Sequence, residues 1–361
     1  MIALLVNGLY ARRLTPLNKV AKWHWMFVIW ALASILWALN SDVSMQRVFT
    51  VVSLLSLYTV VSMYGFRQNE YEFIKKAIMY GGVAAAIYTI YSHLFLGTFY
   101  TGNKSEMRAS LMFGNMASDP NYLMFYLLIP FAICVYGAIT SKGFWKKFYY
   151  SLMVLAMVYT GTITASRGGL LSMIAIVLVI AYYSSRKQKV LIGIIAAIVT
   201  FLALSVASEM LFMRFDRIAN GSGRLGIWEV GLTAFKHNLM GVGLDNFPVA
   251  YGYYLNDVPS AGVGLGEHMV AHNIYMETLV NFGPIGLVIL LIILLGNFKL
   301  LKSSVRKLGD AELLKAAFMG MLLQAFTLGV LWKKQFWLIF FLISIYHNIA
   351  EKKNVEPYSV V

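Results

Sequence analysis

Long, uninterrupted hydrophobic runs alternate with short polar segments through most of the sequence. Several runs approach or exceed the roughly 20 residues that a helix needs to cross a bilayer. Because apolar and polar residues do not alternate within the runs, the pattern excludes a transmembrane barrel. We expect an all-α, polytopic protein in which residues 1–361 form one integral membrane domain with about ten transmembrane helices: Val20–Leu39, Val48–Gly65, Ala77–Gly97, Pro120–Ile139, Phe148–Thr164, Gly169–Ser184, Val190–Ala207, Phe282–Phe298, Leu313–Leu331 and Gln335–Ile349.

The longest polar and glycine-rich segment, residues 209–271, is predicted to be one large loop that contains short helices. Arg224 to His237 is expected to form an amphipathic helix with Ser222 as its cap. Large apolar side chains recur there at three- and four-residue spacing, and they predict one apolar face: Leu225, Trp228, Leu232 and Phe235.

Two further helix starts follow from proline and capping signals. A short helix is expected to begin near His272 and to stop at Gly283, and Pro284 then opens the next span. Asp119 is expected to cap the span that begins at Pro120 in the same way.

Composition supports the membrane assignment. The chain is 59% hydrophobic and 13% charged, whereas soluble domains carry about 25% charged residues. The single cysteine, Cys134, lies in an apolar run, which excludes a disulfide framework and a cysteine-based metal site. A net charge of +14 would suggest nucleic acid in a soluble protein, but the distribution of charge over the loops explains it here, so no nucleic-acid partner is expected.

The loops on alternate sides of the predicted spans differ in basic residues. If the loop before the first span is cytoplasmic, that side holds 19 Lys and Arg residues and the other side holds 10. The positive-inside rule then places the long loops 98–119 and 209–271 outside and both termini in the cytoplasm. Met1 to Leu9 is apolar but too short for a typical span, and no cleavable signal peptide is evident, which leaves the N-terminal topology open.

Arg224 is a candidate anion-binding residue. It is expected in the first turn of a helix, where free backbone amides favour phosphate, and its guanidinium is a permanent bidentate donor. A solvated arginine that orients the loop is the commoner alternative for a single position. The surrounding GSGRLG string also fits G-x-G-x-x-G, but it follows no predicted strand and lies outside, so it does not indicate a nicotinamide cofactor, and no other cofactor is expected.

Arg167 lies in the string SRGG, a tight external turn between two apolar spans. A charge held so close to the hydrocarbon is a functional candidate by default, although a side chain that snorkels to the headgroups is the alternative. Gly168 and Gly169 favour the functional interpretation, because they would let a bulky anionic group approach the backbone.

His272 is a candidate general base on the same side of the membrane. A helix N-terminus disfavours the imidazolium and keeps the ring neutral, which is the form that a general base requires. A hydrogen-bonded interfacial histidine is the alternative. His268 stands four residues earlier, but without a clear third ligand a metal site is only weakly indicated.

The candidate residues suit one class of reaction. Carboxylates are scarce in the loops and no paired Asp-x-Asp motif is present. Two arginines can neutralise the charge that develops on a leaving phosphate, and a histidine can accept the proton of an acceptor hydroxyl. Group transfer from a diphosphate, without a divalent metal, fits this inventory.

The motifs, taken in order, resemble those of the O-antigen ligase and polymerase superfamily. The resemblance covers about residues 20 to 300, and the ordered series is more specific than any one motif. Members of that family usually begin with additional spans. The matching strings are WALASILWALNSD (Trp30 to Asp42), MRASLMFGNMASDPNYLMFYLLIP (Met107 to Pro130), SRGG, GRLGIWEV, HNLMGVGLDNF (His237 to Phe247) and AHNIYMETLVNFGPIG (Ala271 to Gly286).

The resemblance implies a class C, membrane-embedded glycosyltransferase of the bacterial plasma membrane, inverting and metal-independent. Such an enzyme moves a glycan from an undecaprenyl-diphosphate carrier to a glycan, lipid or protein acceptor on the outer face. Arg167 and Arg224 would bind the carrier diphosphate, and His272 would activate the acceptor. Other residues of the same motifs are expected to support them: Arg108, Asp119, Asn121, Trp228 and Asn273.

Two rivals from other classes remain. A transporter or flippase for lipid-linked glycans would carry charges at mid-span along a path, and only Lys315 comes near that description. A non-catalytic assembly scaffold is the third reading. Within the enzyme reading, ligation and polymerisation are both open.

Overall fold

The computed structural model describes residues 6–8, 10–11, 13–97, 108–113, 116–185, 188, 193, 224–258, 269–301 and 309–355. The expected cap Ser222 and, apart from one residue, the expected span at 190–207 lie outside the described residues.

The chain divides into two compact units. Unit 1 consists of Met1–Arg67, Arg217–Leu300 and Ala325–Val361, and unit 2 consists of Gln68–Asp216 and Leu301–Gln324. The expected single membrane domain stays a prediction. Arg224 and His272 belong to unit 1, whereas Arg167 belongs to unit 2.

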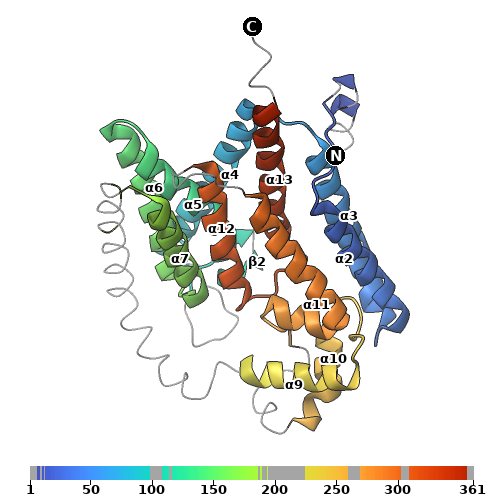
Figure 1. The fold of residues 1–361 in the computed structure, drawn as a ribbon. Helices are drawn as coiled ribbons and strands as arrows, with labels where there is room; N and C mark the ends of the chain where they lie inside the picture. The colour runs from blue at the N-terminus through green and yellow to red at the C-terminus, as the bar shows by residue number, and fades with distance from the viewer. Residues whose placement is uncertain are drawn as a thin grey trace. The chain divides into compact units, whose positions relative to one another are not determined.

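Unit 1 is built from α-helices and two short 3-10 helices. Asn40 begins the second long helix, since its side chain accepts hydrogen bonds from the backbone N–H groups of Asp42 and Val43. Figure 1 shows α9 running crosswise to α2 and α3. The described elements are α2 (Ala21–Ala33), η1 (Ser34–Trp37), α3 (Ser41–Met63), α9 (Arg224–His237), α10 (Phe247–Tyr254), η2 (Leu255–Asp257), α11 (Ile274–Leu300) and α13 (Lys334–Val355).

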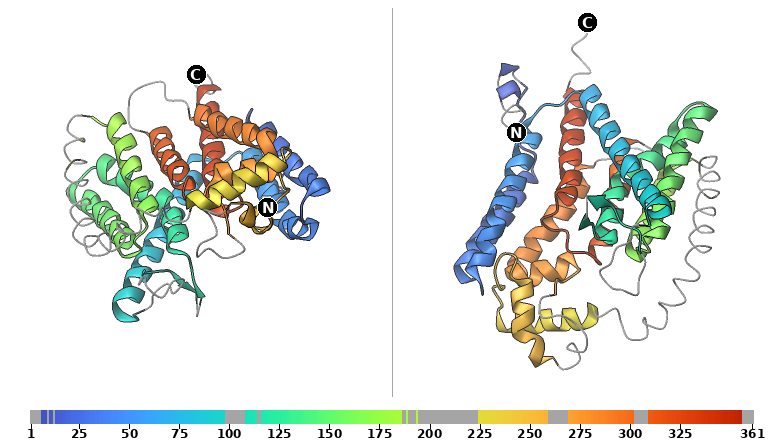
Figure 2. Two further views of the ribbon diagram at one scale, coloured as in Figure 1. Left: turned by 90° about the horizontal axis from the view of Figure 1, so that it is seen from below. Right: turned by 180° about the vertical axis from the view of Figure 1, so that it is seen from behind.

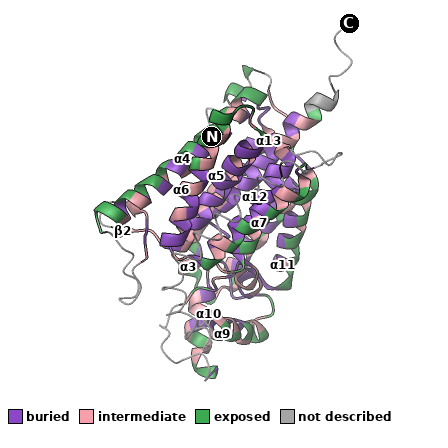
Figure 3. Cartoon of the chain, turned by 90° about the vertical axis from the view of Figure 1, so that its left-hand side faces the viewer, coloured by how far each residue is buried: buried purple, intermediate pink, exposed green. Residues whose placement is uncertain are grey.

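Unit 2 is organised around one buried helix. Asp119 caps α5 and Pro120 is its first residue, as the sequence predicts. Almost the whole of α5 is buried (Figure 3), and α6 and α7 pack beside it (Figure 2). The elements are α4 (Gln68–Phe95), the two-residue strands β1 (Met112–Phe113) and β2 (Met116–Ala117), α5 (Pro120–Thr140), α6 (Phe144–Ile163), α7 (Arg167–Tyr183) and α12 (Asp310–Ala325).

Four of the described helices are long and apolar enough to cross a membrane, namely α3, α4, α5 and α11, and α7 is a shorter apolar helix. A polytopic helical protein is therefore supported, while the expected ten spans stay a prediction. Two expectations need correction. The long loop at 98–119 contains the small β1–β2 hairpin, and the helix expected over 313–331 ends at Ala325.

Contacts at the two ends of unit 1 agree with the prediction that successive loops lie on alternate sides of the membrane. At one end of unit 1, Asn18 donates to Ser344 and Asn348 donates to the carbonyl of Ser62. At the other end, the start of α3 meets the loop before α10, where Arg47 pairs with Asp245 at 2.5 Å. The loops predicted to share a side thus lie together within this unit. Which end faces the cytoplasm stays a prediction.

A break in α11 connects that helix to the large loop. Gly283 has φ 66° and ψ −171°, which are not helical, and Pro284 follows it. The break leaves carbonyl oxygens without helical donors, because proline has no N–H and the chain turns. Three of these carbonyls accept other bonds: Val280 from the N–H of Val242 at 2.8 Å, Asn281 from the N–H of Gly243 at 2.9 Å, and Phe282 from the indole N–H of Trp30 at 2.9 Å.

Glycine is required where the large loop meets this break. Gly241 and Gly243 have φ of 91° and 100°, in the region that L side chains rarely adopt. A Cβ on Gly241 would lie 2.4 Å from the carbonyl oxygen of Asn281. A Cβ on Gly283 would lie 2.6 Å from the carbonyl oxygen of Leu239. The loop and the break in α11 therefore approach so closely that any side chain at Gly241 or Gly283 would clash with backbone atoms.

The predicted helix Arg224–His237 is confirmed as α9, but its predicted packed face is wrong in part. The buried residues are Ile227, Val230, Gly231 and Ala234. Leu225 and Leu232, by contrast, are 68% and 40% exposed. The buried face lies next to the expected one because Gly231 has no side chain, which lets the ring of Phe247 in α10 approach the helix. A Cβ at Gly231 would lie 2.9 Å from Cε2 of Phe247.

Candidate functional site

The candidate residues of unit 1 lie on two segments that are tied together. Trp228 of α9 donates its indole N–H to the carbonyl of Ala271 at 2.8 Å. Arg224, half-buried, is the first residue of α9, and His272 follows Ala271 directly. We call Arg224, Trp228, His272 and Asn273 the unit 1 site. The bond from Trp228 fixes the loop that carries His272 against the helix that carries Arg224.

His272 is held by an unusual backbone. It has φ 47°, in the left-handed region, and the next residue, Asn273, caps α11. The Asn273 side chain accepts from the N–H groups of Tyr275 and Met276 at 2.9 and 3.1 Å, and its carbonyl accepts from the N–H of Glu277. His272 thus precedes the cap instead of lying inside the helix. Strain of this kind persists only where neighbours impose it, and it concentrates at functional sites.

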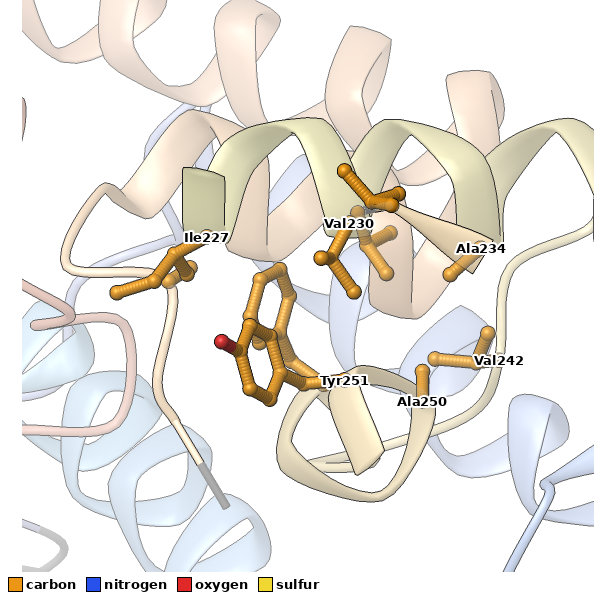
Figure 4. Packing of buried hydrophobic residues seen from close by; sticks show 10 residues of the cluster. Ile227, Val230, Ala234, Val242, Ala250 and Tyr251 are labelled. Atoms are coloured by element: carbon orange, nitrogen blue, oxygen red, sulfur yellow. The ribbon is translucent and has the colours of Figure 1, made fainter. Parts of the chain in front are cut away.

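A hydrophobic cluster lies beneath the unit 1 site (Figure 4). It contains Ile227 and Val230 from α9, Tyr251 from α10 and Ala271 from the loop before α11, all 2% exposed or less. Trp228 packs against its edge. The same apolar contacts that stabilise α9 on α10 therefore also hold the backbone next to His272.

In unit 2, Arg167 lies at a sharp turn between α6 and α7. Ala165 has φ 49°, and Ser166 caps α7 by accepting from the N–H of Gly169 at 3.4 Å. Arg167 is the first residue of α7 and its side chain is exposed. The predicted tight turn is confirmed, and Arg167 occupies the same position in its helix as Arg224 does in α9.

The amide of Asn121 organises this turn. Its Oδ1 accepts from Arg108 Nη2 at 3.0 Å and from Ser166 Oγ at 2.9 Å. Arg108 Nε also donates to the carbonyl of Thr164 at 2.8 Å. Asp119 accepts from the N–H of Asn121 at 2.7 Å. The residues expected to support Arg167 therefore form one network at the turn that precedes it. We call Arg108, Asp119, Asn121 and Arg167 the unit 2 site.

The interpretation of Gly169 changes. A Cβ at this position would lie 2.6 Å from Cβ of Met124, and Gly169 is buried. Its open face is filled by α5, so it serves the packing of α7 on α5 and offers no approach to an anion.

The structure thus brings the predicted residues together as two groups, one in each unit. The expected meeting of Arg167 with Arg224 and His272 stays a prediction. Among the described residues, no three His, Cys, Asp or Glu side chains are grouped as a metal site would require. His268 lies outside the described residues.

Comparison with known proteins supports the family that the motifs indicate. The O-antigen ligase family model matches residues 152–291. The exopolysaccharide production protein ExoQ of Rhizobium meliloti (strain 1021) is 26% identical over 293 residues, which cover 76% of this chain. Both findings support placing this chain in the O-antigen ligase and polymerase superfamily. The resemblance inferred from the motifs is confirmed. The aligned region covers 64% of the length of ExoQ.

The O-antigen ligase segment divides the candidate residues. Residues 152–291 include Arg167, Arg224, Trp228, His272 and Asn273. Arg108, Asp119 and Asn121 precede it. The network around Asn121 is nevertheless connected to the segment, because Arg108 and Asn121 both bond the turn at Thr164 and Ser166.

Sequence reasoning missed two polar groups near the candidate sites. Gln324 donates from Nε2 to the carbonyl of Asn121 at 2.8 Å. It stands 203 residues away in an apolar helix, so no local pattern marks it. Tyr251 was missed as well, because the chain has 22 tyrosines and nothing in its sequence neighbourhood sets it apart.

Proposed function

We propose that this protein is a glycosyltransferase of the bacterial plasma membrane that moves a glycan from an undecaprenyl-diphosphate carrier to an acceptor hydroxyl on the outer face. The observation that carries the proposal is the bond from Trp228 to Ala271, within the O-antigen ligase segment. It joins a helix that begins with an arginine to a loop that carries a histidine. A cation and a base held by one scaffold suit group transfer from a phosphate ester.

The donor diphosphate is assigned to the two arginines. Arg167 and Arg224 are each the first residue of a helix. Backbone N–H groups in the first turn lack partners within the helix, and the helix dipole adds positive charge there. An arginine at that position adds two parallel hydrogen bonds to a phosphate. Such a clamp neutralises the leaving diphosphate without a divalent cation.

His272 is assigned the acceptor. A neutral imidazole takes the proton of the attacking hydroxyl as its oxygen bonds to the anomeric carbon, while the carrier diphosphate leaves with the electron pair of the broken bond. Direct attack on the face opposite the leaving group inverts the anomeric configuration. The left-handed backbone of His272 and the cap at Asn273 fix where the His272 backbone lies relative to α11.

Two classes of acceptor fit the proposal: a second carrier-linked glycan, or a hydroxyl of a distinct lipid or protein. ExoQ is named as an exopolysaccharide production protein. This name favours a growing polysaccharide as the acceptor, and hence polymerisation.

The rival reading, a transporter without catalysis, requires charges along a path through a unit. The buried charges of unit 2 do not favour it. Lys75 Nζ contacts Asp310 and Glu72, each at 2.8 Å, so it pairs where the first turns of α4 meet the start of α12. Lys315 lies 3.9 Å from Glu312 in the same early part of α12. These groups pair with one another near helix ends.

Reconstitution of the whole chain in proteoliposomes with a purified undecaprenyl-diphosphate glycan tests the proposal. A glycosyltransferase makes a new glycosidic bond, detected by mass spectrometry of the products. A ladder of lengths indicates polymerisation, and a single addition to a distinct acceptor indicates ligation. A change in the sidedness of the glycan with no new bond would contradict the proposal and support the transporter.

A further inference from the structure

The buried hydroxyl of Tyr251 has no hydrogen-bond partner in the part of the chain that the structure describes. The residue is 1% exposed and lies in the cluster beneath the unit 1 site. Its hydroxyl oxygen makes no hydrogen bond to any of the described residues. A buried hydroxyl of this kind is unfavourable for folding, since it has lost its bonds to water and gained none. Phenylalanine would fill the same space without that penalty, so packing alone does not account for the hydroxyl.

The hydroxyl is directed toward the candidate site. Figure 4 shows it pointing from α10 to the Ile227 end of α9. Ile227 is one helical turn from Arg224, the first residue of α9. Ala271, which precedes His272, belongs to the same cluster. Tyr251 therefore shares a buried cluster with a residue from each of the two segments that carry the arginine and the histidine.

We propose that the Tyr251 hydroxyl donates a hydrogen bond to a diphosphate oxygen of the lipid-linked donor at the start of α9. This inference rests on the proposed function and adds a third, uncharged contact to Arg224 and the helix N-terminus. Phosphate oxygens are the acceptors for which the start of a helix is suited. Because the hydroxyl has no exposed surface, the contact requires a local rearrangement at this end of α9.

The protonation state of the residue agrees with this role. Burial raises the pKa of Tyr251 above its usual value near 10, because the phenolate would lose its hydration. The group therefore stays protonated near neutral pH and keeps a proton that it can donate to a phosphate oxygen. A phenolate beside a diphosphate would repel it, whereas a neutral hydroxyl binds it.

The same helix supplies a matched control. Tyr254, three residues further along α10, accepts a hydrogen bond from Asn238 Nδ2 at 3.0 Å, and its ring stacks on His237. Its hydroxyl is thus used within the fold. Removing each hydroxyl by substitution with phenylalanine separates a binding role from a structural one.

The test is binding of undecaprenyl diphosphate to the purified full-length protein, together with its thermal unfolding temperature. For Tyr251→Phe we expect the dissociation constant to rise about tenfold or more, as for a lost bond to a charged group, with an unchanged or higher unfolding temperature. For Tyr254→Phe we expect a lower unfolding temperature and unchanged binding.

Three results would overturn the inference. If Tyr251→Phe binds the probe like the wild type while Arg224→Ala binds it weakly, Tyr251 has no binding role and the proposed function stands. If Tyr251→Phe unfolds at a temperature as low as Tyr254→Phe, the hydroxyl is structural. If the wild type itself does not bind undecaprenyl diphosphate, the proposed function fails together with the inference.

Discussion

Single residues decide how the large loop meets the membrane helices. Gly241 and Gly283 approach each other's segments as bare backbone, Gly241 against the carbonyl of Asn281 and Gly283 against that of Leu239. Both have positive φ. The sequence shows glycines at these positions, but only the structure shows that they hold the loop before α10 to the break in α11.

Gly241→Ala should destabilise the protein by about 2 kcal/mol or more, because the new Cβ combines an unfavourable φ with a clash against backbone. The measurement is thermal unfolding of the detergent-solubilised protein. Gly81→Ala is the control, since a Cβ there would meet nothing within 4 Å in the interior of α4. It should be neutral or slightly stabilising. Equal unfolding temperatures for the two variants would contradict this account of Gly241.

Asn121→Ala should lower glycan transfer through the Arg167 turn. The substitution removes the acceptor shared by Arg108 Nη2 and Ser166 Oγ, so both donors lose this hydrogen bond. We expect transfer to fall at least tenfold, with a loss of stability of about 1–3 kcal/mol. Ser172→Ala is the control in α7, because the Ser172 hydroxyl donates to the carbonyl of Gly168 in its own helix. A full transfer rate for Asn121→Ala would argue against the network.

The sequence indicated Arg108, Asp119 and Asn121 as supporting residues, but it did not predict their arrangement. The partners of Asn121 stand 13, 45 and 203 residues away. Motifs report residue types at short spacing, whereas these bonds depend on how α5, α7 and α12 pack. The cap at Asp119-Pro120 was predicted correctly because it depends only on neighbouring residues at one helix end.

At the scale of elements, α9 shows what periodicity can and cannot predict. The helix and its ends were predicted, and the packed face was wrong in part. The helix has two adjacent apolar stripes, one with Leu225 and Leu232 and one with Ile227 and Val230. Periodicity favours the stripe with larger side chains. The small residues Gly231 and Ala234 let α10 and α11 approach the other one.

Trp228→Phe tests the connection between α9 and the loop before α11. Loss of the bond to Ala271 should destabilise the protein by about 1 kcal/mol and lower the transfer rate, because the loop that carries His272 is no longer fixed to α9. Trp337→Phe removes an equivalent indole bond, to the carbonyl of Leu331 at 2.9 Å. It should cost similar stability and leave transfer nearly unchanged. Equal transfer rates in both variants would show that the connection has no functional role.

At the scale of the whole molecule, the orientation predicted from basic residues is open to direct measurement. Cys134 is buried and is the chain's single cysteine. In a Cys134→Ser background, cysteine at the exposed Lys236 in α9 should react with a membrane-impermeant maleimide in spheroplasts. Cysteine at the exposed Lys146, near the start of α6, should react only after permeabilisation. The reverse pattern would invert the predicted topology and place the unit 1 site on the wrong face.

The hydrophobic pattern predicted the main helices of both units, because each is a continuous apolar run. It did not predict the division into two units, which depends on contacts between distant segments such as Asn18 with Ser344. The two arginines and the histidine could likewise be predicted from local motifs. The hydrogen bonds that hold the segments carrying them join residues far apart in the sequence, so only the structure shows them.

Transfer by His272→Ala in proteoliposomes, with undecaprenyl-diphosphate glycan as donor, tests the central claim most directly. Loss of a general base should lower kcat by about a hundredfold or more. Donor binding should stay near that of the wild type, because Arg224 and the start of α9 are untouched. A His272→Ala protein that forms the glycosidic bond at the wild-type rate would contradict the account.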